Sequence, residues 1–228
     1  VLLGACMPDE QGTDWPVYLG DNGRRHYSEL DQITRDNVNE LQVAWVYDSG
    51  EPRGGSSTMY TSPLVVDGVL YGLSPQLGAF ALNAASGEEL WRFDPELRGA
   101  AQRGLMWWEQ GQQRRIFYTA GRELLALDAA TGASVENFGE NGRLDLTPAG
   151  GRNGYVGVTV PGVVFEDLII LGFSTNETAE AYPGSIRAFS ALDGELVWQF
   201  DTIPAPGSPG SETWADGSLK HAGGANVW

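Results

Sequence analysis

Short runs of alternating apolar and polar residues, separated by tight turns, recur along this chain. In the clearest example, residues 80–82 and 89–93 alternate in this way, and the link between them contains Gly87. A period of two is typical of a β-strand that buries one face, and a short link with glycine favours a hairpin because glycine tolerates a positive φ. The pattern therefore predicts antiparallel pairs of strands.

A second kind of hairpin precedes some of these units. Residues 63–71 contain two apolar runs around Asp67 and Gly68, and residues 161–171 repeat the arrangement around an acidic pair. Two-residue links of this kind connect adjacent strands of an antiparallel sheet. Together the two hairpins predict units of four short strands.

The hairpin sequences belong to a repeat. Three segments superpose without gaps on the frame Ala-apolar-x-Ala-x-x-Gly-x-x-x-Trp-x-Phe-Asp; they are residues 80–94, 125–139 and 187–201. Their glycines are 45 and 62 residues apart, and residues 45–48 form a partial copy upstream. Four short antiparallel strands in about 45 residues correspond to one blade of a β-propeller. We therefore predict an all-β propeller of four-stranded antiparallel blades, of which about four are present.

Small and aromatic residues of the repeat predict how the blades pack. The alanines leave a slot between adjacent sheets, so we expect Trp91 and Trp198 to fill such slots and lock the sheets together. One helix is also predicted. Thr34 can cap residues 35–41, with Ile33 packing on Val38 across the cap.

The composition agrees with a folded, β-rich protein and limits its partners. Of 228 residues, 31 are glycine, 42% are hydrophobic and only 19% are charged, which excludes a disordered chain or a helical rod. The formal net charge is −16. Nucleic acids and anionic lipid surfaces are therefore disfavoured as main partners, because both need a basic face.

The single cysteine, Cys6, excludes an intrachain disulfide framework and a cysteine-rich zinc site. The order Leu-Gly-Ala-Cys that ends at Cys6 resembles a bacterial lipobox, in which the cysteine receives a lipid. We therefore expect residues 1–13 to be a leader remnant and linker, and the protein to be periplasmic and tethered through Cys6. A chance run of small residues before a cysteine is the alternative.

The repeat and the segments between its copies resemble one family. The frame is similar to the tryptophan-docking motif of quinoproteins, the eight-bladed propeller dehydrogenases that hold pyrroloquinoline quinone (PQQ). The intervening segments are more specific and occur in the family's order; among them are residues 15–21, 33–45, 103–105, 138–143, 183–189 and 223–228. The resemblance implies that residues 14–228 are the N-terminal, incomplete part of a single eight-bladed propeller domain.

The resemblance also implies a cofactor site near residues 223–228. PQQ is a flat ortho-quinone with three carboxylates, so its site needs an aromatic floor, a cation and a metal near the quinone oxygen. Trp228 matches the family's indole floor. Gly223, Gly224 and Asn226 lead up to it, and the glycines let the backbone approach the ring.

Four further residues match polar positions of the family. Arg103 matches a cofactor-contacting arginine that can bind a carboxylate or a quinone oxygen, and Thr159 matches a hydroxyl donor. The family binds Ca²⁺ in the loop before residues 183–189, and hard oxygen ligands suit this ion. Glu177 is the leading ligand there and Asn176 the second, with Glu180 as an alternative to Glu177.

The implied activity is PQQ-dependent oxidation of an alcohol, polyol or sugar hydroxyl, with electrons passed to a cytochrome c or to ubiquinone. Some alcohol-oxidising relatives carry two adjacent cysteines at the quinone, and their absence before Arg103 favours the sugar and polyol branch. The family's general base is an aspartate of a later blade, expected beyond Trp228. No catalytic residue is therefore assigned, and the fragment alone is expected to be inactive.

Two hypotheses without catalysis also explain the docking repeat. One is a lipid-anchored scaffold like the propeller lipoprotein of the outer-membrane assembly machinery, and the other is a sugar-binding or sensory propeller that has lost its quinone. Neither accounts for Arg103-Gly-Leu or for residues 223–228. Within the dehydrogenase reading, Ca²⁺ and a lanthanide both remain candidates for the metal.

Overall fold

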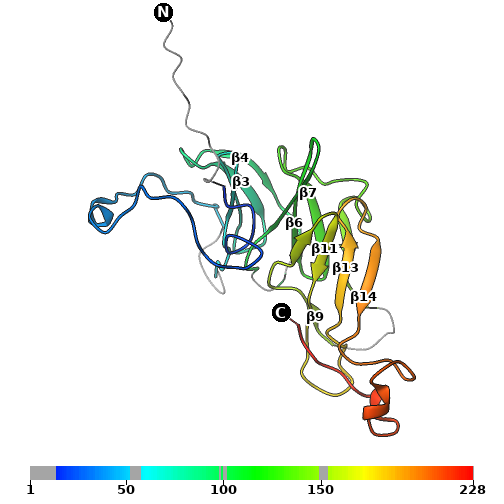
Figure 1. Ribbon diagram of the computed structural model, residues 1–228. Coiled ribbons are helices and arrows are strands. Elements are labelled where there is room, and N and C mark those ends of the chain that lie inside the picture. The colour runs from blue at the N-terminus through cyan, green and yellow to red at the C-terminus, as the bar shows by residue number, and fades with distance from the viewer. Residues whose placement is uncertain (1–13, 52–57, 98, 100–101, 149–153, 228) are drawn as a thin grey trace, which may run out of the picture.

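The computed structural model describes residues 14–51, 58–97, 99, 102–148 and 154–227. In this part of the chain three four-stranded antiparallel sheets stand side by side (Figure 1). We call them blades 1, 2 and 3. Blade 1 contains β1 (Leu64–Val66), β2 (Val69–Leu73), β3 (Ala79–Asn83) and β4 (Glu89–Phe93); blade 2 contains β5 (Met106–Gln110), β6 (Gln113–Ala120), β7 (Glu123–Asp128) and β8 (Arg143–Asp145); blade 3 contains β10 (Val163–Phe165), β11 (Leu168–Leu171), β13 (Ile186–Ser190) and β14 (Leu196–Phe200).

Each blade is a meander in which neighbouring strands pair in chain order. The first strands of blades 2 and 3, β5 and β10, contact each other, which makes the first strand the inner strand of its blade. The predicted all-β architecture of four-stranded antiparallel blades is confirmed. The described residues contain three complete blades.

The predicted hairpin link between the third and fourth strands has the same hydrogen bond in every blade. The repeat glycine donates its N–H to the carbonyl of the last residue of the third strand, or its equivalent: Gly87 to Asn83, Gly132 to Asp128 and Gly194 to Ser190, each at 2.8–2.9 Å. The three glycines have φ values of 74°, 71° and 81°. Residues with a Cβ rarely adopt this backbone conformation, which explains why glycine recurs at this position.

Two insertions account for the longer spacing before the third repeat. The first is the linker between blades 2 and 3, which carries β9 (Val156–Gly157), and the second is the loop between β11 and β13, which carries β12 (Ser174–Thr175). β9 and β12 pair with each other in an antiparallel manner. The two insertions therefore build one additional structure beside blade 3.

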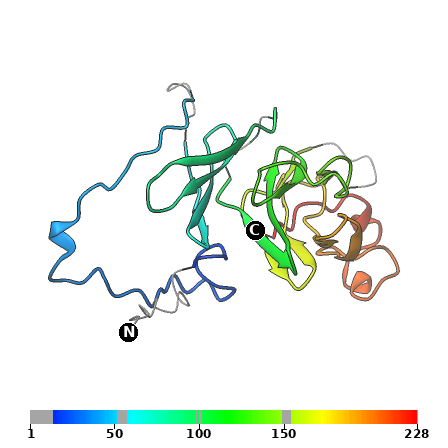
Figure 2. The same cartoon turned by 90° about the horizontal axis from the view of Figure 1, so that it is seen from above.

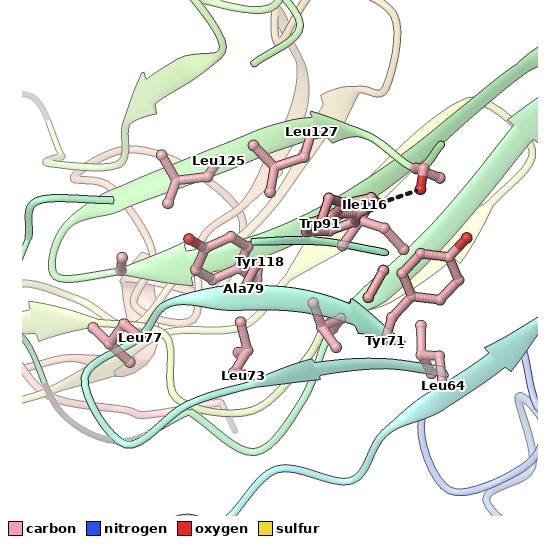
Figure 3. Packing of buried hydrophobic residues seen from close by; sticks show 14 of the residues in the cluster. Leu64, Tyr71, Leu73, Leu77, Ala79, Trp91, Ile116, Tyr118, Leu125 and Leu127 are labelled. Carbon is pink, nitrogen blue, oxygen red and sulfur yellow. Dashed lines mark hydrogen bonds between the residues drawn. The ribbon is translucent and has the colours of Figure 1, made fainter. Parts of the chain in front are cut away.

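Trp91 fills the slot between blades 1 and 2, as predicted. It is 8% exposed, and its indole Nε1 donates to the carbonyl of Ala129 at 2.9 Å, drawn as the dashed line in Figure 3. A Cβ on Gly132 would lie 2.5 Å from the indole ring, so this glycine is needed for close approach as well as for its φ. Leucine, isoleucine and tyrosine side chains from both blades complete the core around Trp91 (Figure 3).

Trp45 docks on blade 1 in the same way. Its Nε1 donates to the carbonyl of Ala84 at 3.1 Å, and a Cβ on Gly87 would lie 2.6 Å from its ring. The partial copy at residues 45–48 is therefore a docking segment that lies where the fourth strand of a preceding blade would lie.

Blades 2 and 3 meet without a docking tryptophan, because the second repeat has the exposed Glu136 at that position. Two other side chains replace the docking tryptophan: one fills the space beside the glycine and the other makes the hydrogen bond. The ring of Phe138 lies 3.3 Å from where a Cβ of Gly194 would be, and Arg115 donates from Nη1 to the carbonyl of Ala191 at 2.7 Å. Ala191 is the counterpart of the alanine that accepts from Trp91.

The predicted helix at residues 35–41 is wrong. The structure has only a single 3₁₀ turn, η1 (Val38–Glu40), with Asn37 rather than Thr34 at its N-cap. Ile33 and Val38 are 62% and 46% exposed, so no apolar face is buried that could stabilise a longer helix. Two further 3₁₀ turns, η2 (Ser211–Thr213) and η3 (Ser218–Lys220), follow blade 3.

Within the described residues, no further sheet covers either lateral face of the three-blade array. Residues 25–47 form a long loop that leaves the sheets and returns to blade 1 (Figure 2). At the other face Trp198 is 39% exposed and every residue of β14 is exposed. Trp198 thus has the position of a docking residue without a following blade in the described structure, so its predicted locking role remains a prediction.

Residues 14–24 lie along the inner strands. Trp15 and Val65 exchange two backbone hydrogen bonds (2.6 and 3.1 Å) in an isolated antiparallel bridge to β1. Within the described residues, no helix has the length and apolar character needed to cross a bilayer.

Candidate functional site

Three residues occupy equivalent places just before the inner strands of the three blades. Ser62 precedes β1, Arg103 precedes β5 and Thr159 precedes β10. Ser62 donates its N–H to the carbonyl of Arg103 (2.9 Å), and Arg103 donates its N–H to the carbonyl of Thr159 (3.0 Å). The fold therefore brings Arg103 and Thr159 together at one end of the inner strands.

The side chains of this pair also meet. Nη1 of Arg103 donates to Oγ1 of Thr159 at 3.3 Å, although the residues are 56 positions apart. Behind them, Oγ1 of Thr119 contacts Oε1 of Gln102 (3.0 Å) and the carbonyl of Val158 (2.7 Å). Gln102 and Thr119 are buried, so they fix the backbone next to each member of the pair. The result is a half-buried guanidinium beside a hydroxyl, which suits an anionic ligand that accepts hydrogen bonds.

A second group lies on the β9–β12 pair, which leads into Thr159. Thr175 of β12 is buried, and both its N–H and its Oγ1 donate to Oδ1 of Asn226 (2.7 and 2.8 Å). Nδ2 of Asn226 donates to the carbonyl of Thr175 (3.1 Å) and to Oε1 of Glu177 (3.4 Å). Glu177 and Asn226, both predicted site residues, are therefore neighbours.

The two predicted glycines hold their segment against the loop that carries Glu177. A Cβ on Gly223 would lie 2.4 Å from the carbonyl oxygen of Ala181, so a side chain there would push the two segments apart. Gly224 has a φ of 83° and accepts from the N–H of Gly184 at 2.8 Å. Whether these glycines also contact a cofactor stays a prediction.

The side chain of Asn176 is not part of this group, although its backbone carbonyl lies 3.5 Å from Oγ1 of Thr175. Oδ1 of Asn176 accepts the N–H of Tyr155 at 2.7 Å, so its amide faces residues 154–155. Glu180, the alternative ligand, pairs with His221, with Oε1 2.5 Å from Nδ1. Among the described residues no three His, Cys, Asp or Glu side chains converge as a metal site. A hard cation here would rely on Glu177 together with amide or backbone oxygens.

Arg187 packs beside the residues that carry the second group. Its Cζ lies 3.8 Å from the centre of the Phe173 ring, and Nη2 donates to the carbonyl of Leu146 at 2.6 Å. Burial lowers the pKa of Arg187 to about 10, although the nearby charge of Asp145 acts in the opposite direction. The carbonyl of Phe173 in turn accepts the N–H of Val227 at 3.0 Å. The buried cation thus packs against the residue whose carbonyl holds Val227.

Two predicted residues lie outside the described part of the chain, namely Cys6 and Trp228. Two others were not anticipated. Ser62 and Thr175 bind the site segments together, yet neither carries a sequence signal that separates it from an ordinary loop residue. Thr175 directly precedes the predicted residues Asn176 and Glu177.

The described residues fit the chemistry of PQQ. A carboxylate-bearing ligand needs a fixed cation and hydrogen-bond donors, which the Arg103–Thr159 pair supplies. A metal beside the quinone needs oxygen ligands, and the carboxylate of Glu177 lies beside the amide of Asn226.

Comparison with known proteins decides the family. The family model described as "PQQ: Glucose/ethanol/alcohol dehydrogenase, beta-propeller domain" matches residues 15–228. The chain belongs to this PQQ propeller family. The match confirms the family that the sequence resembles and favours it over a scaffold or a sensory propeller.

Individual members of the PQQ propeller family are similar over most of this chain. Quinoprotein glucose dehydrogenase of Escherichia coli (strain K12) is 32% identical over 219 residues, covering 82% of this chain and 27% of the relative. The dehydrogenase subunit of alcohol dehydrogenase (quinone) of Gluconobacter oxydans is 32% identical over 244 residues, covering 94% and 30%.

A solved structure agrees with these sequence relatives. Quinohemoprotein alcohol dehydrogenase from Comamonas testosteroni superposes with a TM-score of 0.70 at 29% identity, covering 86% of this chain and 28% of that protein. The chain thus spans less than a third of the length of these members of the PQQ family.

Proposed function

We propose that this chain is part of a PQQ-dependent dehydrogenase that oxidises an alcohol, polyol or sugar hydroxyl. The observation that carries the proposal is the contact between Arg103 and Thr159 at the start of two neighbouring inner strands. In a propeller the ends of the inner strands surround the axis, so polar side chains there face one central ligand. Membership of the PQQ family gives that ligand its chemistry.

Each site residue has a defined task in this proposal. Arg103 binds a cofactor carboxylate or quinone oxygen, and the hydroxyl of Thr159 donates a hydrogen bond beside it. Trp228 forms the flat floor, and Glu177 holds the cation, for which we propose Ca²⁺. When bound, PQQ supplies an ortho-quinone that takes up the two electrons and the hydrogen removed from the substrate carbon.

The open lateral faces support the proposal that residues 14–228 are an incomplete propeller. Trp45 docks on blade 1 from a segment with no partner strands among the described residues, and the exposed Trp198 occupies the docking position of blade 3. Further blades from the same polypeptide would cover both faces. We therefore expect activity only from the complete protein.

We further propose that the enzyme works in the periplasm and passes its electrons to a cytochrome c or to ubiquinone. The lipobox-like order before Cys6 supports export and a lipid tether. Labelling cells with a clickable palmitate should tag the protein and should not tag Cys6→Ser. Labelling of Cys6→Ser would refute the tether without affecting the proposed oxidation.

The test of the proposed activity uses the full-length protein. The purified apoprotein is supplied with PQQ and Ca²⁺, and reduction of an artificial electron acceptor is followed with a panel of alcohols, polyols and sugars. We expect dye reduction that needs both additions and that Arg103→Ala abolishes. If no substrate reduces the dye and PQQ leaves the tryptophan fluorescence unquenched, the proposal fails.

A further inference from the structure

The amide of Asn226 is held in one orientation by the protein itself. Its Oδ1 accepts both the N–H and the Oγ1 of Thr175, at 2.7 and 2.8 Å. A carbonyl oxygen has two lone pairs, and both are used here. Turning the amide over would place its NH₂ group against the Thr175 N–H, so the position of Nδ2 is fixed.

The fixed Nδ2 has two acceptors. It donates to the carbonyl of Thr175 at 3.1 Å and to Oε1 of Glu177 at 3.4 Å. Both N–H groups of the amide thus donate to acceptors of the protein itself. Asn226 has no donor or acceptor left for a cofactor, although the sequence placed it among the cofactor-binding residues.

We propose that Asn226 is a positioning residue that orients the carboxylate of Glu177 for metal binding and ties it to the segment leading to Trp228. The inference rests on the proposed function, since it concerns the cation that Glu177 would hold. Glu177 is exposed and lies in a loop, where a carboxylate without such a contact samples several rotamers. Thr175 is 4% exposed. The hydrogen bonds between Thr175 and Asn226, which we call the clamp, are therefore anchored on a buried residue, although Glu177 itself is exposed.

The hydrogen bonds of Asn226 also connect two parts of the site. Asn226 precedes Trp228 by two residues and Glu177 follows Thr175 by two. One amide therefore links the loop that carries Glu177 to the segment that leads to Trp228. Residues that orient metal ligands in this way typically contribute 10- to 100-fold to metal affinity, as an order of magnitude.

The experiment measures Ca²⁺ binding directly, without turnover. The full-length apoprotein is titrated with Ca²⁺ alone by calorimetry, for the wild type, Asn226→Ala, Thr175→Val and Asn22→Ala. We expect Asn226→Ala to weaken Ca²⁺ binding by about 10- to 100-fold. Thr175→Val keeps the backbone contact and should weaken binding by a few-fold, whereas the exposed Asn22 is the matched control and its variant should bind as the wild type does.

A second readout covers the case in which Asn226→Ala is poorly folded. Hydrogen exchange of the backbone amide of residue 175 reports its contact with Asn226 without any metal. It should be slightly faster in Thr175→Val, which keeps only the backbone hydrogen bond, clearly faster in Asn226→Ala, and unchanged in Glu177→Gln. Glu177→Gln should nevertheless lose Ca²⁺ binding.

The outcomes separate this inference from the proposed function. Wild-type Ca²⁺ affinity in both clamp variants would overturn the inference and leave the proposed function intact. A wild-type protein that binds neither Ca²⁺ nor PQQ would overturn both.

Discussion

Arg115 of β6 donates from Nη1 to the carbonyl of Ala191 at 2.7 Å. Between blades 2 and 3 it thus makes the hydrogen bond that the indole of Trp91 makes between blades 1 and 2. Nη1 of Arg115 also contacts the carbonyl of Leu192 at 2.8 Å, and the guanidinium lies 5.1 Å from the centre of the Trp108 ring. Burial lowers the pKa of Arg115. A buried cation with oxygen acceptors and an aromatic face can thus replace a docking tryptophan.

Removal of this cation should destabilise the protein. Arg115→Leu leaves the buried carbonyl of Ala191 without this donor and takes one of two side-chain donors from the half-buried carbonyl of Leu192. We therefore expect the free energy of unfolding to fall by about 2–4 kcal/mol. The neighbouring Arg114 is the control, since its pair with Asp67 is about half exposed and Arg114→Leu should cost less than about 1 kcal/mol. Denaturant unfolding of the full-length protein measures both, and equal losses would contradict the proposed role of Arg115.

The docking glycine offers a second test. Gly132→Ala would place a Cβ 2.5 Å from the indole of Trp91 at a φ of 71°, so it combines a steric clash with backbone strain. Gly111→Ala has a similar φ of 60° but open space around the Cβ, and it isolates the strain, about 1 kcal/mol. We expect Gly132→Ala to lower the melting temperature clearly further than Gly111→Ala. Equal shifts would mean that the indole can move aside without cost.

Alkaline pH should destabilise the attachment of residues 45–50 to blade 1. Burial, assisted by the neighbouring Glu89, raises the pKa of Tyr47 to about 12 from its ordinary value of 10. The folded protein therefore keeps a proton that the unfolded chain releases, and the stabilisation present below pH 10 is lost as the pH rises towards 12. Burial raises the pKa of Tyr71 to about 12 as well, so it acts in the same direction.

Unfolding measured from pH 8 to 12 checks this dependence. The decrease in stability above pH 10 should become smaller in Tyr47→Phe and in Tyr71→Phe, while the values near pH 8 report the separate cost of losing each hydroxyl. An unchanged slope in both variants would assign the alkaline loss to other groups.

Arg103 should dominate cofactor affinity. A charge-assisted hydrogen bond to an anion contributes about 1.5–3 kcal/mol, so Arg103→Gln should weaken PQQ binding by about 10- to 100-fold. Thr159→Val removes only a neutral donor and should weaken it by less than about 10-fold. Quenching of tryptophan fluorescence by PQQ at saturating Ca²⁺ gives both constants. The reverse order of the two effects would show that the guanidinium does not face the cofactor.

The sequence predicts the blades well because their signals are local. Alternation, the turn glycine and the docking aromatic all lie within some fifteen residues, so the fold and the role of Trp91 follow from the repeat itself. The helix at residues 35–41 fails for a related reason. Its capping residues are present, but no apolar face packs against another element, and capping alone does not hold so short a helix.

The site is only partly predictable because its geometry is nonlocal. Arg103 and Thr159 were found through resemblance, and the structure brings them together. The clamp between Thr175 and Asn226 joins residues 51 positions apart, and no periodic pattern encodes it. The same holds for Arg115, whose acceptor is 76 positions away.

The bridge between Trp15 and Val65 also bears on how the polypeptide should be handled in the laboratory. An unpaired strand edge is a template for aggregation, and the two hydrogen bonds of Trp15 close part of the inner edge of β1. Deleting residues 14–24 to shorten the protein would uncover that edge. An expression plasmid that keeps residues 14–24 should therefore give more soluble material than one from which only these residues are deleted.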